Sequence, residues 1–219
     1  MPRVCFTLLS CLLLLLAALA LAAATAPVDD PADVAALLDV YAATGGDRGA
    51  WTNALHWGNT SAGLCAWFGV TCGEFNVSSS SSSSSSPVLV RRVTALALPK
   101  NGLSGGPLPD SLGALAQLTV LDLSRNQVNG SIPETVWQLV NLERLALDSN
   151  RLTGVLSDGV GNLTRLVELK LEENQLGGML DLRKCTIFPS ECASYSFLYI
   201  SFNRVLFLAK APFPPQSGA

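Results

Sequence analysis

A short skeleton of apolar residues recurs four times in this chain and constrains its fold more than any other feature. Each copy reads L-x-x-L-x-L-x-x-N-x-L, with Val replacing Leu at two positions. The copies begin at Val93, Leu118, Leu142 and Leu166, so the stride is constant to within one position. A regular repeat of this kind is typical of a solenoid, in which every unit is one coil that stacks on the next.

The first half of each unit alternates apolar and variable residues, which is the pattern of a short strand with one buried face. In the second unit this pattern places Leu121 and Leu123 inside and Asp122 outside. One coil alone has no closed core, so its leucines are buried only by neighbouring coils. The pattern therefore predicts stacked coils whose strands lie side by side.

The asparagine of each unit is interpreted as a structural residue. These residues are Asn101, Asn126, Asn150 and Asn174. They fall where the chain bends and leaves backbone groups unpaired, and an amide side chain both donates and accepts hydrogen bonds. Direct ligand contact is the alternative that we disfavour.

A helix and an aromatic segment precede the repeats. Asp30 and Pro31 favour a helix start, apolar residues follow at helical spacing, and Gly45-Gly46 ends the helix. Residues 65–72 then read C-x-W-x-G-V-x-C. We expect Trp51, Trp57 and Trp67 to cover the first coil, whose leucines would otherwise face water; a sugar- or lipid-binding platform is the alternative.

These residues resemble plant-type extracellular leucine-rich repeat proteins, such as receptor-like proteins and polygalacturonase-inhibiting proteins. Residues 118–141 match the fuller family consensus L-x-x-L-x-L-x-x-N-x-L-x-G-x-I-P-x-x-L-G-x-L, and residues 31–73 resemble the family's N-terminal cap. The resemblance implies an α/β repeat fold. It would be a short right-handed solenoid of four to five coils, with parallel strands on the concave face and a helical, disulfide-tied N-terminal cap.

Several positions depart from the family pattern. The first unit has an extra residue at Gly105-Gly106, the third has Leu156-Ser157 where Ile-Pro is expected, and the fourth loses the pattern after residue 177. Trp137 takes a position that is usually Gly. It is either an exposed anchor for a partner or a residue packed on the convex side.

The N-terminus predicts export. Residues 4–24 carry no charge and end in small residues, which is typical of a secretory signal peptide over residues 1–24. An uncleaved signal anchor is the alternative, because the run is just long enough to span a bilayer. We therefore expect a secreted or cell-surface protein.

Four cysteines would remain after cleavage: Cys65, Cys72, Cys185 and Cys192. Of their three possible pairings we favour Cys65–Cys72 and Cys185–Cys192, because each pair is closely spaced and the pairs flank the repeats. Zinc binding is disfavoured since no C-x2-C spacing is present. Four N-glycosylation sequons begin at Asn59, Asn76, Asn129 and Asn162.

Two further segments complete the expected organisation. Ser78 to Ser86 form an unbroken run that we expect to be disordered, either O-glycosylated or a neutral expansion. A fifth copy of the skeleton is expected after a longer spacer, with Tyr195, Leu198, Ile200, Asn203 and Val205 in its defining positions, so that Leu198 corresponds to Leu169. The expected segments are signal peptide 1–24, cap 25–77, Ser-rich insertion 78–87 with a strand resuming at 88–92, repeats 88–184, irregular last coil or C-terminal cap 185–208, and tail 209–219.

The sequence gives no sign of catalysis. His56 is the only histidine, it lies between two cap tryptophans, and we expect it at the cap surface. Nucleophile-elbow, zinc-protease and phosphate-loop motifs are absent, so we expect neither an enzyme nor a cofactor or metal site. The net charge of −3, without a basic stripe, argues against nucleic acid as a partner.

The outward positions of the strands are the candidate binding surface. The charged residues expected on the concave face are Lys100, Asp122, Arg125, Arg144, Asp148, Glu168, Lys170 and Glu172. The resemblance implies an extracellular recognition module for a protein or peptide ligand, with a cell-wall glycan as a further partner class. Membrane contact is expected only through a partner or an uncleaved anchor. The alternatives are a structural or adhesive glycosylated surface protein and a fragment of a longer receptor.

Overall fold

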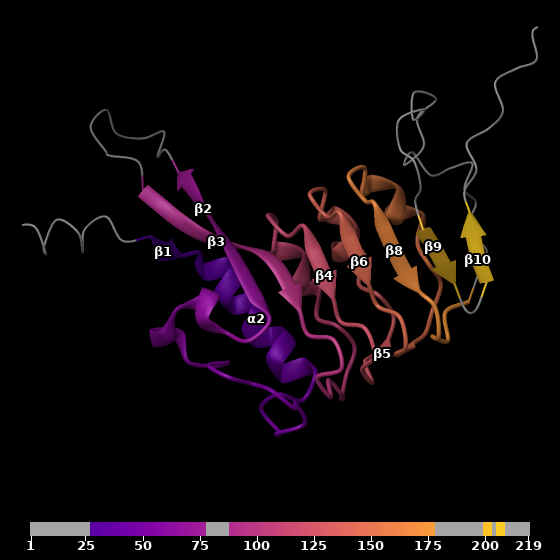
Figure 1. The fold of residues 1–219 in the computed structure, drawn as a ribbon, viewed down its shortest axis with the longest axis horizontal. Helices are drawn as coiled ribbons and strands as arrows, with labels where there is room; N and C mark the ends of the chain where they lie inside the picture. Colours follow the sequence, from indigo (N-terminus) through magenta and orange to yellow (C-terminus); the bar gives the residue numbers. More distant parts are fainter. Residues whose placement is uncertain (1–26, 78–87, 178–198, 203–204, 209–219) are drawn as a thin grey trace, which may run out of the picture.

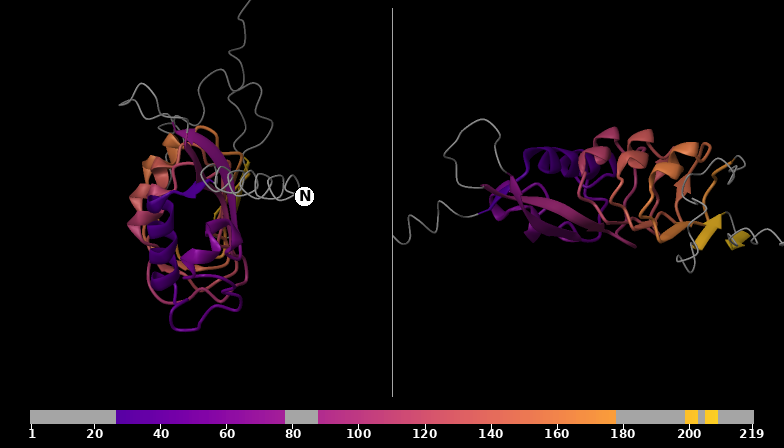
Figure 2. Two further views of the ribbon diagram at one scale, coloured as in Figure 1. Left: turned by 90° about the vertical axis from the view of Figure 1, so that its left-hand side faces the viewer. Right: turned by 90° about the horizontal axis from the view of Figure 1, so that it is seen from above.

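A computed structural model describes residues 27–77, 88–177, 199–202 and 205–208 of the 219-residue chain. Successive coils follow one another along a single axis, with a row of strands on one side (Figure 1). Viewed along that axis, the chain forms a flattened tube with strands on one wall and helical segments on the opposite wall (Figure 2). The predicted fold class, a short solenoid with parallel strands and a helical cap, is confirmed.

The row of strands forms one sheet, and its central strands are parallel. They are β3 (Val88–Ala97), β4 (Val120–Asp122), β6 (Arg144–Ala146) and β8 (Glu168–Leu171). Leu96, Leu121, Leu145 and Leu169 are paired across these strands in the register that the repeat predicts. All four leucines are completely buried, so the stacked columns form the core.

The opposite, convex wall carries one short 3₁₀ helix in each of the first three coils. They are η3 (Asp110–Ala114), η4 (Glu134–Gln138) and η5 (Asp158–Asn162). Trp137 in η4 is only 2% exposed, and its ring packs over Gly159, where a Cβ atom would lie 3.0 Å from the ring. Trp137 is therefore a packing residue of the convex wall rather than an exposed anchor.

The asparagines form the expected ladder. Asn126 Oδ1 accepts hydrogen bonds from the backbone N–H groups of Asn101 (2.9 Å) and Leu103 (3.1 Å) in the preceding coil. Its Nδ2 donates to the carbonyls of Leu98 and Leu123 (both 2.9 Å). Asn150 and Asn174 repeat this arrangement one and two coils later, whereas Asn101 bonds instead to the backbone of Asn53 in the cap.

The cap begins with β1 (Val28–Asp29) and α2 (Pro31–Ala43). Asp30 caps the helix by accepting from the N–H groups of Ala32 and Asp33, as the sequence predicts. Two short 3₁₀ helices, η1 (Thr60–Ala62) and η2 (Leu64–Ala66), lead to β2 (Val70–Val77). The cap carries the disulfide Cys65–Cys72, the first of the two favoured pairs.

The three cap tryptophans form one buried cluster with Tyr41. Trp51, Trp57 and Trp67 are 6%, 7% and 1% exposed, and neighbouring ring centroids lie 4.7 and 5.1 Å apart. Their indole N–H groups all donate to backbone carbonyls. The cluster therefore covers the end of the solenoid, and the alternative of an exposed ligand platform is wrong.

The cap continues into the first coil without a break. The strand expected over residues 88–92 and the first repeat strand are one continuous strand, β3, whose other edge pairs antiparallel with β2. The extra residue of the first unit lies at the end of α2, where Gly106 N–H donates to Ala43 O (2.9 Å) and Ser104 N–H to Thr44 O (2.9 Å). The departure from the family pattern thus accommodates the docked helix.

The C-terminal strand differs from the expectation in register. In β9 (Tyr199–Phe202), the partner of Leu169 is Ile200, whereas the repeat pattern predicts Leu198. A shift of two positions preserves the alternation of a strand, so the apolar pattern alone fits both registers. Val205, expected in the bend after Asn203, instead begins β10 (Val205–Leu208), which runs antiparallel to β9. A hairpin therefore ends the described sheet.

Several sequence predictions lie outside the described residues. They are the signal peptide, the Ser-rich insertion, the pair Cys185–Cys192, the positions Tyr195, Leu198 and Asn203, and the tail.

A second small sheet, β5 (Asn129–Gly130) with β7 (Arg151–Leu152), lies beside the main one. Within the described ranges, no helix combines the length and apolar character needed to cross a membrane.

Candidate functional site

The outer face of the main sheet, here called the concave face, looks away from the 3₁₀ helices (Figure 2). Its central column contains Ala97, Asp122, Ala146 and Lys170, which the sheet register pairs in that order. Inward leucines flank each of them, so strand alternation turns these four residues outward. Adjacent members of a column are about 5 Å apart because neighbouring strands have that spacing.

Three of the expected site residues form an ion network on this face. Glu168 lies between Arg144 and Lys170, with carboxylate-to-nitrogen distances of 2.6 Å to Arg144 Nε and 2.6 Å to Lys170 Nζ. The hydrogen bond to Glu168 raises the pKa of Lys170 above its ordinary value. Arg144 and Lys170 remain substantially exposed, so the network is accessible to a partner.

The strand ends of the second to fourth coils contribute three carboxylates. Asp122 Oδ1 accepts hydrogen bonds from the backbone N–H (3.0 Å) and hydroxyl (2.7 Å) of Ser124. Asp148 is buried, and this burial, reinforced by the carboxylate of Glu172, raises its pKa. Glu172 Oε2 is buried without a hydrogen-bond partner among the described residues.

Residues at the bend after each strand share an unusual backbone conformation. Lys100, Arg125, Ser149 and Glu173 have φ angles of 51°, 57°, 54° and 55°, in the left-handed region that non-glycine residues seldom adopt. They occupy the same position in four successive units. The sequence contains no glycine there to signal this conformation.

Lys100 and Arg125 at these bends are exposed cations. Neither forms an ion pair with a residue of the described part of the chain. Backbone hydrogen bonds hold each bend on the next coil: Lys100 N–H donates to Ser124 O (3.0 Å), and Arg125 N–H donates to Asp148 O (2.8 Å). The two cations are thus held in place by the backbone while their charges face solvent.

A different set of charges, which the sequence interpretation did not identify, joins the cap to the first coil. Asp33 is fully buried and accepts hydrogen bonds from Val93 N–H (2.7 Å) and from Arg92 Nη2 (2.9 Å) and Nε (3.1 Å). Asp33 also raises the pKa of Arg92. Asp29 pairs with Arg91 at 2.8 Å. Two adjacent arginines, Arg91 and Arg92, indicate that acidic partners are nearby in the fold. Sequence alone does not identify these partners, because they are far away along the chain.

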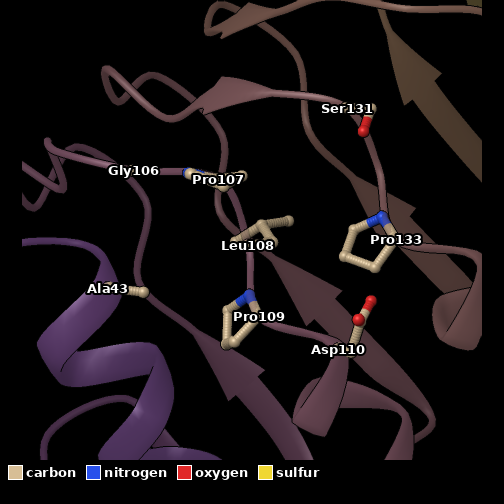
Figure 3. Close-up of a pocket in the computed structure, with 8 residues that line it drawn as sticks. All are labelled: Ala43, Gly106, Pro107, Leu108, Pro109, Asp110, Ser131 and Pro133. Atoms are coloured by element: carbon tan, nitrogen blue, oxygen red, sulfur yellow. The ribbon is translucent and has the colours of Figure 1, made fainter.

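A shallow hollow of about 520 Å³ lies on another side of the solenoid, beside the end of α2. Pro107, Leu108 and Pro109 run between Ala43 and Pro133 along its floor (Figure 3). Asp110 is its only ionisable residue. Its other polar side chain is the hydroxyl of Ser131, and no histidine or lysine lines it.

The remaining expected site residues lie at the surface. Asn76 in β2 and Asn162 in η5 are exposed, and Asn59 is an exposed residue that caps η1. Asn129 in β5 is half-buried and donates to Gly105 O (2.6 Å). His56 is exposed, as expected. In the described ranges no three His, Cys, Asp or Glu side chains are grouped as metal ligands.

Comparison with known families assigns two segments of the chain. A model described as leucine rich repeat N-terminal domain matches residues 30–73, and one described as leucine rich repeat matches residues 91–152. Phytosulfokine receptor 2 of Arabidopsis thaliana is 46% identical over 63 residues, which are 29% of this chain and 5% of that receptor. The match therefore covers only a small part of the relative.

Two solved structures resemble most of the chain. The leucine-rich repeat ectodomain of the receptor kinase SOBIR1 from Arabidopsis thaliana has a TM-score of 0.62 at 25% identity, over 82% of this chain and 95% of that chain. The structure of PEPR1–AtPEP1 has a TM-score of 0.55 at 27% identity, over 78% of this chain and 21% of that chain.

Proposed function

Because this chain is a leucine-rich repeat protein with a leucine-rich repeat N-terminal domain, we propose that it is an extracellular recognition module. Its ligand is a protein or a peptide, which binds on the concave face. The similarity to the ectodomain of the plant receptor kinase SOBIR1 and to the structure of PEPR1–AtPEP1 supports this class of function.

The observation that carries the proposal is the charge on the concave face. The eight charged residues expected there come from four coils, and all of them except Asp148 are at least partly exposed. They project from a frame that the asparagine ladder and the leucine columns hold rigid. A rigid, preorganised surface loses little conformational entropy on binding, which favours recognition of an extended partner.

The cap supports an extracellular location. The disulfide Cys65–Cys72 requires an oxidising environment to persist, and exposed sequons at Asn59, Asn76 and Asn162 can be reached by the glycosylation machinery of the secretory route. The charged face offers groups that can bind a ligand, and they are not arranged as a catalytic site. Any signalling or inhibition would therefore follow from the binding of the ligand and not from catalysis.

The test is a binding experiment with a blocked face. Ala97→Arg together with Val120→Arg places two long side chains at half-buried positions of this face, where Lys170 and Arg144 in the same columns already show that such side chains fit. The matched control, Ala114→Arg with Gln138→Arg, adds the same charges at exposed positions of η3 and η4. Both variants should melt like the wild type.

Partners captured on the immobilised secreted chain, then identified and purified, supply the ligands for calorimetry. We expect the concave variant to lose binding and the convex control to retain it. Full binding by a folded concave variant would rule out the proposed face, while loss of binding by the control alone would place the site on the convex wall.

A further inference from the structure

The charges of the concave face are not equally available to a ligand. Lys170 is held by Glu168, and Asp122 is hydrogen-bonded by Ser124. Five other charges lie at the ends of the strands and at the bends that follow them. None of the five has an ion-pair partner in the described part of the chain, although Glu173 accepts a hydrogen bond from the Ser149 hydroxyl (2.8 Å). This set, here called the bend strip, consists of Lys100, Arg125, Asp148, Glu172 and Glu173.

The bend strip has opposite signs at its two ends. Lys100 and Arg125 belong to the first and second coils, whereas Asp148, Glu172 and Glu173 belong to the third and fourth. Backbone hydrogen bonds join successive bends, from Lys100 to Ser124, Arg125 to Asp148, and Ser149 to Glu172. The order of the charges along the solenoid is therefore fixed by the stacking of the coils.

At the acidic end of the bend strip, the carboxylates of Asp148 and Glu172 are partly buried but only partly neutralised by neighbouring groups. Asp148 is only 9% exposed, and its carboxylate accepts a hydrogen bond from its own backbone N–H. Lys170 attracts this carboxylate, but its ammonium group is paired with Glu168. The nearby Glu172 has a buried oxygen, Oε2, with no partner among the described residues. Buried carboxylate oxygens without donors are unfavourable, so an ammonium or guanidinium group from outside would supply what the fold does not.

We propose that the bend strip binds an extended peptide segment of mixed charge in one orientation, with an acidic side chain over Lys100 and Arg125 and a basic side chain over Asp148 and Glu172. This inference rests on the proposed function, because it names the chemistry and polarity of the ligand on the same face. It also excludes ligands of uniform charge as good partners.

The dimensions of the strip set the spacing of the two charges. The ligand's acidic group over the first and second coils and its basic group over the third and fourth are two strand spacings apart, roughly 10 Å. An extended segment rises about 3.3 Å per residue, so these acidic and basic residues are separated by about three positions. A helical segment would cover only about 5 Å with the same number of residues and could not reach both ends.

Three synthetic peptides with fluorescent labels serve as probes, all built on the same glycine–serine sequence. One carries a pair of glutamates and a pair of lysines roughly 10 Å apart when extended, one carries lysines at both places, and one carries glutamates at both. Anisotropy titrations at low salt should show that the wild type binds the mixed peptide about tenfold more tightly than either uniform peptide, with weaker binding at high salt.

Charge-exchange variants test the polarity. Lys100→Glu with Arg125→Glu makes the strip acidic and should shift the preference to the all-lysine peptide. Glu172→Lys with Glu173→Lys makes it basic and should shift the preference to the all-glutamate peptide. The variant with all four changes has reversed polarity and should again prefer the mixed peptide. Lys100 and Arg125 already occupy positive-φ positions equivalent to Glu173, so the backbone tolerates these side chains.

Equal binding of all three peptides to the wild type, or a mixed-peptide preference that survives in either uniformly charged variant, would overturn the inference. So would failure of a folded four-residue exchange variant to recover the mixed peptide. The proposed function is tested separately, since it requires only that Ala97→Arg with Val120→Arg abolish partner binding. If that variant loses partner binding and the bend-strip variants do not change peptide preference, the concave face remains the binding site and the proposed charge order of the ligand is wrong.

Discussion

A cluster of arginine and carboxylate groups at the cap junction and another on the concave face differ mainly in burial. At the cap junction, Asp33 is fully buried and receives three hydrogen bonds from Arg92 and Val93. On the concave face, Glu168 bridges Arg144 and Lys170, whose side chains are 55% and 42% exposed. The same residue types therefore join two parts of the fold in one place and are open to solvent in the other.

Burial decides which role each cluster has. Breaking a buried, hydrogen-bonded pair leaves an uncompensated charge in a region without water, whereas water replaces a lost partner at the surface. The cap cluster should therefore control stability and the concave cluster should control binding. Four changes test this contrast, and they are ordered here by the size of their expected effect.

The largest effect is expected for Asp33→Ala. This change leaves the buried Val93 N–H without its acceptor and leaves the guanidinium of Arg92 with only its longer contacts to Asp30 (3.5 Å) and Ala114 O (3.4 Å). We expect the free energy of unfolding to fall by about 3 kcal/mol. Equilibrium denaturation in urea measures the loss. Asp39→Ala, at an exposed position of the same helix, is the matched control and should change stability little. Similar stabilities of the two variants would remove the proposed role of the cap cluster.

An intermediate effect is expected for Asn126→Ala, which tests whether burial acts without charge. The change leaves the buried N–H groups of Asn101 and Leu103 without an acceptor, so we expect a loss of about 2 to 3 kcal/mol. Denaturation compares it with Gln127→Ala, whose side chain is exposed. A loss below that of the control would show that water or neighbouring groups replace the ladder.

A smaller effect on stability is expected for Glu168→Ala. Its partners are exposed, and the pairs of such networks contribute less than about 1 kcal/mol each. The same variant should nevertheless weaken binding of a purified partner, because Arg144 and Lys170 lose their common orientation. Calorimetry and urea denaturation on one preparation separate the two quantities. A loss of stability comparable to that of Asp33→Ala would contradict the contrast between the clusters.

The smallest effect is a pH dependence at Asp148. Burial, and after it the carboxylate of Glu172, raise the pKa of Asp148 above the unfolded value of 3.8, so the folded protein holds this proton more tightly than the unfolded chain does. As the pH rises from 3.8 through the raised pKa, ionisation of Asp148 lowers the free energy of unfolding, and the loss persists at neutral pH.

Asp148→Asn removes this ionisation. We expect the variant to be slightly more stable than the wild type at neutral pH and to lose that advantage below pH 3.8, as measured by urea midpoints across a pH series. An advantage that stays constant at every pH would mean that packing, and not the carboxylate, is responsible.

Repeating elements of the fold were predictable because their signals lie close together in sequence. The leucine columns, the asparagine ladder and the start of the cap helix at Asp30 each follow from a local pattern that recurs or has a known chemical role. The C-terminal register was not predictable. Leu198 and Ile200 both fit the strand alternation as partners of Leu169, and only the observed pairing with Ile200 separates the two registers.

The candidate site was predictable as a set of positions but not as a pattern of charge pairs. Strand alternation placed Asp122 and Lys170 on one face, yet it carried no information on which acid would hold which base. It also did not show that Asp33, which reads as a residue of the helix start, reaches Arg92 from a distant part of the sequence.

The sequence by itself determined the coil architecture and the columns that face the concave surface, because a periodic apolar pattern specifies both the stacking and the side of each residue. Only the tertiary structure decided which charges are neutralised and which remain for a ligand. Ion pairing depends on separations of about 3 Å between atoms of different coils. The stacked fold brings such atoms together at Glu168 and Asp33 and leaves Lys100 and Arg125 without an ion-pair partner among the described residues.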